Sequence, residues 1–434
     1  MKRFALAAFL IAGLSPSAHA ATPLTLNEAI AKALATHPDA LIADNREEAA
    51  ELAVADAQSQ RFTLSTDVSA LSRTSQAGLL GQGPLPQATN QQSINGNLSL
   101  TVPLFTGFKL TNAVASAQHQ RDAAASSRRQ TRQELTIQVT RAFWQLRQAE
   151  LVEEIQQEAI AQTERTLKLT RAGYALGRQT TSDVDRVEVS VLNAKNEQLR
   201  LQGETLQART ELATLLGADA DALSIDGASA TLSTAIALPS RERVERLLDQ
   251  RPDVQAAAAR LRAAEASLAV AGGDRWPQLS LVTTYQHGNN PYDPTLGARG
   301  FSSSVSGTWD ARLAASFNLF DGGKIHRAIA RSEGEVREAR ATLEKARREA
   351  RLQAEKALIR LKSARDRLEL TDKSTSIAGK TLKWVETRYQ QGYASQVEVN
   401  DSLGSLVTSR TQRVQALIDA QLARAELDRA LGTL

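Results

Sequence analysis

The sequence predicts a mainly α-helical fold with a smaller β component, built from two copies of one unit. Similar segments recur 215 residues apart over most of the 434-residue chain. All eleven prolines lie at or before residue 103 or between 239 and 294, so residues 104–238 and 295–434 can form very long helices. Only 4% of the residues are aromatic, and alanine, leucine, arginine, glutamine and glutamate are abundant. That composition is typical of long packed helices.

The chain begins with a predicted secretory signal peptide, residues 1–20. Lys2 and Arg3 precede an apolar run at Phe4–Leu14, and Ala18–Ala20 is an A-x-A cleavage site. No later stretch has about 18 consecutive apolar residues, so we expect entry into a membrane, if any, to use strands. The absence of cysteine excludes disulfides, thiolate zinc sites and a lipid anchor on an N-terminal cysteine.

Direct comparison of the two halves defines the repeated unit. Leu104–Lys109 (LFTGFK) matches Leu319–Lys324 (LFDGGK), and Ala208–Gly217 matches Ala423–Gly432, with no gap between these anchors. Upstream of Pro277 the offset is 214, because the second copy has one extra residue near that proline. We therefore predict repeat 1 at residues 21–217, a linker or equatorial segment at 218–238, and repeat 2 at 239–434.

Each unit is expected to contain a long helix followed by a shorter one. In the first copy the apolar positions step by three or four residues and so form one helical stripe: Leu135, Val139, Ala142, Leu146, Ala149, Val152, Ile155 and Ala159. The predicted long helices span about 108–172 and 324–388, and the short helices about 181–216 and 396–432. Because propensity alone does not stabilise such helices, they must pack side by side.

The segments before each long helix have a period of two. Trp309 and Leu313 fall on one face of such a segment, and Asp310 and Arg312 on the other. Membrane barrels have at least eight strands, so four strands in a bilayer would require oligomerisation. Three chains would supply twelve strands and twelve helical columns. The predicted strands of one chain, which form two hairpins, are about 61–73, 93–105, 278–287 and 303–320.

The turns between the long and short helices carry the most specific motif. The pattern Y-x-x-G-x-x-T-x-x-D-V at Tyr174–Val184 recurs as Y-x-x-G-x-x-S-x-x-E-V at Tyr389–Val399. Glycine ends the first helix, and the Thr or Ser three residues later is the N-cap of the next helix. The acidic residue at the third helical position completes a capping box.

These motifs, in the order helix, hairpin, long helix and helix, resemble the TolC family of outer-membrane efflux proteins over the whole mature chain. The resemblance implies a homotrimer in which a 12-stranded β-barrel, set in outer-membrane lipid, continues into a 12-column α-helical barrel in the periplasm. It implies a passive exit duct of a tripartite efflux or type I secretion system. A periplasmic adaptor and an inner-membrane transporter would open its helical tip. No enzymatic activity, cofactor, metal or lipid anchor is expected.

The resemblance also implies roles for residues of the two tips. Asp183 and Tyr389 match groups that latch the closed tip in the family, and Glu398 and Asp401 match two acids that form selectivity rings at the aperture. Ala394 stands where TolC has an arginine in the latch, so that salt link cannot form here. The turn residues expected to contact the adaptor are Gly177, Thr180, Gly392 and Ser395.

A purely structural role competes with several of these assignments. Capping alone explains Asp183 and Glu398, and a solvated helix face explains Asp401. We keep both interpretations open at this point.

The alternative from another class of protein is a soluble periplasmic coiled-coil scaffold or adaptor, which would use the same helices for protein contacts. It leaves the two long hairpins with one apolar face unexplained. The motifs G-x-S-x-G and H-E-x-x-H and the P-loop are absent, which argues against an enzyme. Loss of Lys2 and Arg3 lowers the formal net charge from +4 to +2, so no nucleic-acid partner is expected. Multidrug efflux and protein secretion both remain open.

Overall fold

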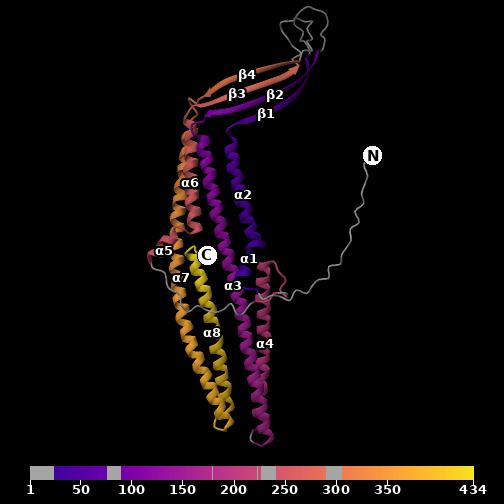
Figure 1. The fold of residues 1–434 in the computed structure, drawn as a ribbon, viewed down its shortest axis with the longest axis vertical. Coiled ribbons are helices and arrows are strands. Elements are labelled where there is room, and N and C mark those ends of the chain that lie inside the picture. Colours follow the sequence, from indigo (N-terminus) through magenta and orange to yellow (C-terminus); the bar gives the residue numbers. More distant parts are fainter. Residues whose placement is uncertain (1–23, 76–88, 178, 222, 226–240, 290–304) are drawn as a thin grey trace, which may run out of the picture. The chain divides into compact units, whose positions relative to one another are not determined.

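The computed structural model describes residues 24–434 except 76–88, 178, 222, 226–240 and 290–304 (Figure 1). The predicted signal peptide, residues 1–20, and most of the predicted linker, residues 218–238, lie outside the described residues. The chain forms two compact units. The strand unit contains Ile42–Thr131 and Arg241–Gln353, and the turn unit contains Met1–Leu41, Arg132–Ser240 and Ala354–Leu434.

The order of two helices, two strands, a long helix and a shorter helix occurs twice along the chain (Figure 1). The elements of the first half are α1 (Leu26–Thr36), α2 (Pro38–Ser59), β1 (Thr63–Ser75), β2 (Thr89–Phe105), α3 (Lys109–Ala175) and α4 (Thr181–Leu216). Those of the second half are α5 (Arg241–Leu248), α6 (Pro252–Gly272), η2 (Gly273–Arg275), β3 (Gln278–Asn289), β4 (Val305–Ser316), α7 (Lys324–Gln390) and α8 (Gln396–Ala430).

The strand unit contains one antiparallel sheet with the order β1-β2-β3-β4. The two hairpins are β1 with β2 and β3 with β4, and the pairing of β2 with β3 joins them. Consequently β1 and β4 are edge strands within this chain, and each has a row of backbone groups without a strand partner.

The two faces of the sheet differ in polarity, as the period of two predicts. Leu98 pairs with Tyr285, which pairs with Trp309, and all three side chains are exposed. The neighbouring row of Ser99, Thr284 and Asp310 points to the opposite face. One face of the sheet therefore presents apolar side chains to its surroundings. Trp309 is the most exposed of these three, at 68%.

The sequence predicts a strand over 303–320, but β4 ends at Ser316, so the prediction is wrong for Phe317–Phe320. Ser316 is paired with Gln278, the first residue of β3. Because β4 pairs only with β3, which starts directly after Pro277, the residues beyond Ser316 have no strand opposite them in this chain. The other strands begin and end within a few residues of their predicted limits.

Helices of the strand unit lie in the same order as the strands that they precede or follow. Hydrogen bonds and ion pairs connect α2 to α3, α3 to α6, and α6 to α7. They are Arg128 with Asp44, Ser116 with Ser267, and Arg340 with Glu265. Of these four helices, α2 and α7 are thus the outer ones, next to the edge strands β1 and β4. The short helix α5 also contacts α7, through the ion pair of Glu245 with Arg351.

The hydrophobic core of the turn unit lies where α1, α3, α4 and α8 meet. Small alanines of α1 allow close approach of the helices, and the larger side chains of the predicted α3 stripe fill the centre. The largest fully buried side chains of this core come from α3, α4 and α8 and are Phe143, Leu146, Leu212, Leu216 and Ile418.

The helix ends deviate slightly from prediction, and their backbone explains why. Both long helices run two or three residues further than expected, to Ala175 and Gln390. The last helix ends at Ala430 rather than 432, because Leu431 is its C-cap and Gly432 has a φ of 73°. Among the described helices, none is both long and apolar enough to cross a bilayer.

Candidate functional site

The turn between α3 and α4 is a capped connection. The amide of Gly177 donates to the carbonyl of Tyr174 at 2.9 Å, and Gly177 has a φ of 70°, which favours glycine. The Thr180 amide donates to the Asp183 carboxylate at 2.9 Å, and the Asp183 amide donates to the Thr180 hydroxyl oxygen at 3.3 Å. Thus both halves of the predicted capping box are present.

The turn between α7 and α8 has the same design with a more complete helix end. Gly392 and Tyr393 donate their amides to the carbonyls of Tyr389 and Arg388, at 3.0 and 2.8 Å, which is a Schellman motif. The Arg388 guanidinium donates to the Tyr393 carbonyl at 2.8 Å. The Ser395 hydroxyl oxygen accepts the amide of Glu398, and the Glu398 carboxylate accepts the amide of Ser395.

Capping also determines the charge of the two acidic residues. Hydrogen bonds from the amide and hydroxyl of Thr180 hold the pKa of Asp183 below its ordinary value. The amide and hydroxyl of Ser395 lower the pKa of Glu398 in the same way, with a smaller contribution from the charge of Arg388. Both carboxylates are therefore ionised at neutral pH and well into the acidic range. Either turn presents a fixed negative charge near the start of a helix, where the helix dipole favours it.

Tyr389 joins the two long helices just before the turns. Its hydroxyl lies 3.2 Å from the hydroxyl of Thr170, which is only 1% exposed. Thr170 donates its own proton to the carbonyl of Thr166 at 3.0 Å, so Tyr389 is the donor in the contact between them. This bond connects α3 and α7 across 219 residues of sequence.

Asp401 lies three residues after Glu398 on α8, and its side chain is exposed. No hydrogen bond or ion pair connects its carboxylate to another described residue. No hydrogen bond joins Asp183 to Tyr389 either, so within one chain the two predicted latch residues have separate partners. Among the described residues there is no cluster of His, Asp or Glu that could hold a metal ion.

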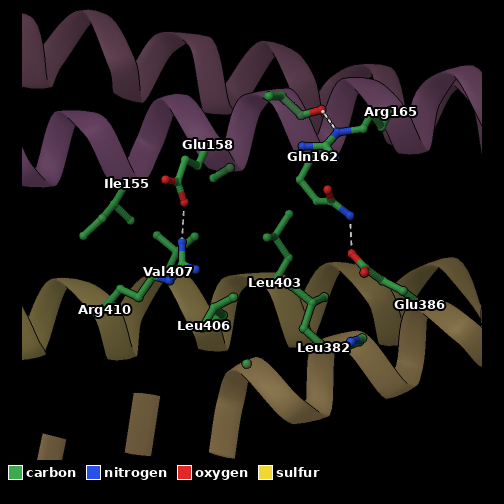
Figure 2. A pocket seen from close by; sticks show the side chains of 14 residues that line it. Ile155, Glu158, Gln162, Arg165, Leu382, Glu386, Leu403, Leu406, Val407 and Arg410 are labelled. Carbon is green, nitrogen blue, oxygen red and sulfur yellow. Dashed lines mark hydrogen bonds and ion pairs between the residues drawn. The ribbon is translucent and has the colours of Figure 1, made fainter. Parts of the chain in front are cut away.

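A groove between α3, α7 and α8 lies in the same unit (Figure 2). Its volume is about 510 Å³. Two polar contacts span it from α3, namely Glu158 with Arg410 of α8 and Gln162 with Glu386 of α7. Between them lie the apolar side chains of Ile155, Leu382, Leu403, Leu406 and Val407.

Sequence reasoning identified Tyr389 but not its partner Thr170. It also did not identify the pairs Gln162 with Glu386 and Glu158 with Arg410. Helical periodicity shows which residues share a face, but it does not show which helix that face meets. One signal was available, since Thr163, Thr166 and Thr170 interrupt the apolar stripe of α3 with hydroxyl groups.

The family model described as "Outer membrane efflux protein" matches the chain twice, over residues 29–218 and 244–433. The chain belongs to the outer membrane efflux protein family. The two matches begin 215 residues apart, which is the offset at which the sequence motifs recur. The resemblance inferred from the turn motifs is thereby confirmed.

Individual relatives of this efflux protein are distant. It is 27% identical to the fusaric acid resistance protein FusA of Burkholderia cepacia over 59% of its own length, and 23% identical to the outer membrane protein OprJ of Pseudomonas aeruginosa over 73%. The matched regions span only 48% of FusA and 65% of OprJ.

The fold agrees more closely than the sequences do. The outer membrane protein VceC of Vibrio cholerae superposes with a TM-score of 0.75 at 22% identity, covering 94% of this chain and 96% of VceC. The CusC structure gives a TM-score of 0.78 over 97% of this chain and 95% of CusC. The predicted fold class of long helices with β-hairpins is confirmed.

Replacing Tyr389 by Phe should loosen the ends of α3 and α7. The substitution removes one hydrogen bond while Thr170 keeps its bond to Thr166, so amide exchange in the last turns of both helices should rise about fivefold. Hydrogen exchange followed by mass spectrometry measures it. Tyr174→Phe is the matched control, because Tyr174 occupies the repeat-equivalent position and its hydroxyl bonds to no described residue. Equal exchange in the two variants would show that the contact contributes nothing.

Proposed function

We propose that the chain is a passive exit duct in the outer membrane of a Gram-negative cell, and that it extends into the periplasm. Family membership and the fold shared with VceC and CusC support this function. The decisive observation is the sheet, whose exposed apolar face, with Leu98, Tyr285 and Trp309, suits lipid while its other face is polar. A soluble scaffold or adaptor would have no use for that face, and a conduit needs no catalytic residues.

We propose that three chains assemble, with twelve strands and twelve helical columns around one channel. Open strand edges are not tolerated in lipid, because backbone groups there have no water to bond. The edges of β1 and β4 in one chain therefore need partners. Three copies of a four-stranded sheet provide them in a barrel large enough for a water-filled lumen.

The partners proposed for this duct are a periplasmic adaptor and an inner-membrane transporter, which supplies the energy. The relatives include proteins named for fusaric acid resistance and for cation efflux, so the family serves different substrates. The described residues contain no site that selects one of them. We place the adaptor contact at the exposed turns, which contain Gly177, Thr180, Gly392 and Ser395.

The turns at 174–184 and 389–401 are proposed to form a gate that opens by an iris-like motion. Three contacts hold α3 against α7 and α8 within a chain: Gln162 with Glu386, Glu158 with Arg410, and Thr170 with Tyr389. A shift of 215 residues converts these pairs into Ile377 with Arg171, Lys373 with Lys195, and Val385 with Tyr174. None of the shifted pairs can form the corresponding bond. In an assembly of repeats the shifted pairs would face each other between chains, so the closed gate would be held by the three contacts within each chain, without equivalents between chains.

Acidic residues near the gate are proposed to favour cations. Three copies each of Glu398 and Asp401, facing one lumen, would concentrate negative potential. The lowered pKa of Glu398 keeps its charge through the physiological range.

Purified protein should form channels in planar lipid bilayers that conduct without any added energy source. Membrane insertion should depend on the apolar face of β2. Leu100→Arg places a charge on the lipid-facing side, at a cost of about 2–4 kcal/mol near the bilayer centre, and should reduce the membrane-embedded fraction. Ser99→Arg, one residue away on the polar face, is the control and should insert normally. Wild-type protein that is extracted without detergent would favour the soluble scaffold instead.

Threonine substitutions should shift the gate in opposite directions. Val385→Thr supplies the shifted contact with the hydroxyl that Thr170 provides inside the chain, so it should lower channel conductance. Thr170→Val removes the contact within the chain and should raise it. Single-channel recording measures both, and Val191→Thr, another buried valine, controls for the added hydroxyl. Unchanged conductance in both test variants would contradict the proposed gate.

Neutralising the acids should reduce cation selectivity without unfolding the turn. Glu398→Gln keeps the capping box, because glutamine serves at the third helical position as glutamate does. Asp401→Asn removes a charge that has no partner among the described residues. The double variant should lower the cation-to-anion permeability ratio measured from reversal potentials in a salt gradient. A ratio equal to that of the wild type would show that these acids form no selectivity ring.

A further inference from the structure

A cavity of the strand unit plays no part in the proposed duct. It lies where α2, α3 and α6 meet and has a volume of about 310 Å³. A water molecule occupies about 30 Å³ in the liquid, so the cavity has room for a solute several times larger than water. Its volume is also at the lower end of the range of small-molecule sites in proteins.

Three arginines line this cavity, one from each helix. They are Arg46 of α2, Arg128 of α3 and Arg260 of α6. Among the described residues of the lining there is no carboxylate. Of the three arginines, only Arg128 has acidic partners in the described part of the chain, because Asp44 and Glu47 of α2 form ion pairs with its guanidinium. The lining therefore has a net positive charge even after this compensation.

The guanidiniums of Arg46 and Arg260 are not neutralised by any described residue. Arg260 donates to the neutral hydroxyl oxygen of Ser127 at 3.1 Å. Arg46 makes no side-chain hydrogen bond or ion pair within the described ranges. On both helices the positions three and four residues away hold alanine, apart from Ile42, so no carboxylate one helical turn away faces either guanidinium. These two charges thus remain available to an anion.

Neutral donors lie beside these charges. The Ser127 hydroxyl accepts from Arg260 and donates to no described residue, so it can donate to a ligand. Gln120 gives one amide proton to the Ser116 hydroxyl at 3.4 Å and keeps a second. Thr131 differs, because its own proton goes to the Ser127 carbonyl at 3.2 Å. The cavity thus offers an anion two charged and two neutral donor side chains.

Small side chains keep the cavity open. Ala43 and Ala123 are buried in its wall, and Ala124 lines it as well. Each has only a methyl group, so the space in front of it is not filled by protein atoms. A larger side chain at Ala124 would fill part of the cavity without changing its charge.

The second copy of the repeated unit lacks this lining. The equivalent of Gln120 on α7 is Glu335, and that of Arg128 is Leu343. An anion at the equivalent surface would therefore meet a carboxylate in place of an amide donor. The backbone plan that the two copies share does not by itself produce the basic cavity, which depends on side chains of the first copy.

The arrangement of the donors favours phosphate over carboxylate. A carboxylate is planar, and the fork of one arginine satisfies both of its oxygens. A phosphate group has three terminal oxygens that point in different directions, so it can accept from donors on several helices at once. In this cavity the donors come from α2, α3 and α6.

The cavity is too far from the sheet for a lipid headgroup to reach it. Arg46 lies thirteen residues before Ser59, the last residue of α2, which corresponds to about 20 Å along the helix. If the sheet lies in a bilayer, as proposed above, the headgroup layer adds only about 5–8 Å on either side. The phosphate therefore belongs to a free solute and not to a membrane lipid.

We propose that this cavity binds one small phosphorylated solute per chain. The phosphate accepts hydrogen bonds from Arg46, Arg260, Ser127 and Gln120, and the remaining volume holds the group to which the phosphate is attached. Arg128 keeps its acidic partners and holds α2 against α3. A passive duct requires no such ligand, so this site is an addition to the proposed function.

Isothermal titration calorimetry of the detergent-solubilised full chain tests the site, with inorganic phosphate as the probe. At constant ionic strength, which removes differences in screening, phosphate should bind saturably with one phosphate per chain. Arg46→Gln and Arg260→Gln should each weaken binding about tenfold, because each removes a charge-assisted hydrogen bond. Acetate, the carboxylate probe, should bind to the wild type about tenfold more weakly than phosphate.

Two further variants separate the cavity from general charge. Arg121→Gln removes an equal charge from α3, where the Arg121 guanidinium bonds to Asp122, and should bind phosphate like the wild type. Ala124→Leu fills the cavity at unchanged charge and should abolish binding. Circular dichroism verifies that all variants keep their helices.

Reconstitution distinguishes a free solute from a lipid headgroup. Phosphate affinity should be equal in vesicles of phosphatidylcholine alone and in vesicles that also contain phosphatidic acid. Weaker binding in the second kind of vesicle would show that the lipid headgroup occupies the cavity, and would overturn the assignment to a free solute.

The remaining outcomes decide the site without touching the duct. Absence of saturable phosphate binding to the wild type would overturn the site, as would an equal loss of affinity in Arg121→Gln and Arg46→Gln. Acetate bound as tightly as phosphate would overturn the preference for phosphate. The proposed duct is tested separately by the bilayer recordings, which need no phosphate.

Discussion

The open edges of the four-stranded sheet are the constraint on which the rest of this structure depends. A strand edge presents amides and carbonyls that must find partners, and lipid offers none. β1 and β4 are those edges here, and each is continuous with an outer helix, α2 or α7. In a membrane, a single chain built in this way would leave the backbone groups of both strand edges without hydrogen-bond partners. Its own inner pairing, β2 with β3 and α3 with α6, already shows how the open edges can be closed.

The helical turns solve a different problem with local chemistry. Each must reverse the chain after a helix of 67 residues and leave no orphan backbone groups exposed to competition. Glycine in the left-handed region ends the first helix, and a capping box starts the next. Asp183 and Glu398 therefore have structural partners that hold them ionised, whereas Asp401 has none in the part of the chain that the structure describes. The two interpretations of these acids are compatible, because a capping carboxylate retains its charge.

Much of the fold could be predicted from the sequence, because its signals are local. Proline placement, a period of 3.6 or 2, and the spacing of Thr180 with Asp183 each depend on residues close together in the chain. The end of β4 was not predictable in this way, since it depends on where its partner β3 begins. The contact of Tyr389 with Thr170 was missed for the same reason. A helical stripe defines a face but not the helix that meets it, and these two residues are 219 positions apart.

Duplication followed by divergence explains how equivalent positions of the two repeats can make different contacts. The two copies of the unit share a backbone plan, so each contact within a chain has an equivalent between chains in the proposed assembly. In the strand unit the equivalent of Ala123 is Glu338, so α7 has a carboxylate where α3 has a methyl group. In the turn unit the equivalents of Glu158 and Arg410 are Lys373 and Lys195, which cannot form the corresponding ion pair and bond to Glu369 and Glu164 instead. In the proposed assembly, such differences between the two long helices would decide where neighbouring chains hold together and where they separate. The proposed duct, closed in the membrane and opening at its turns, requires that division.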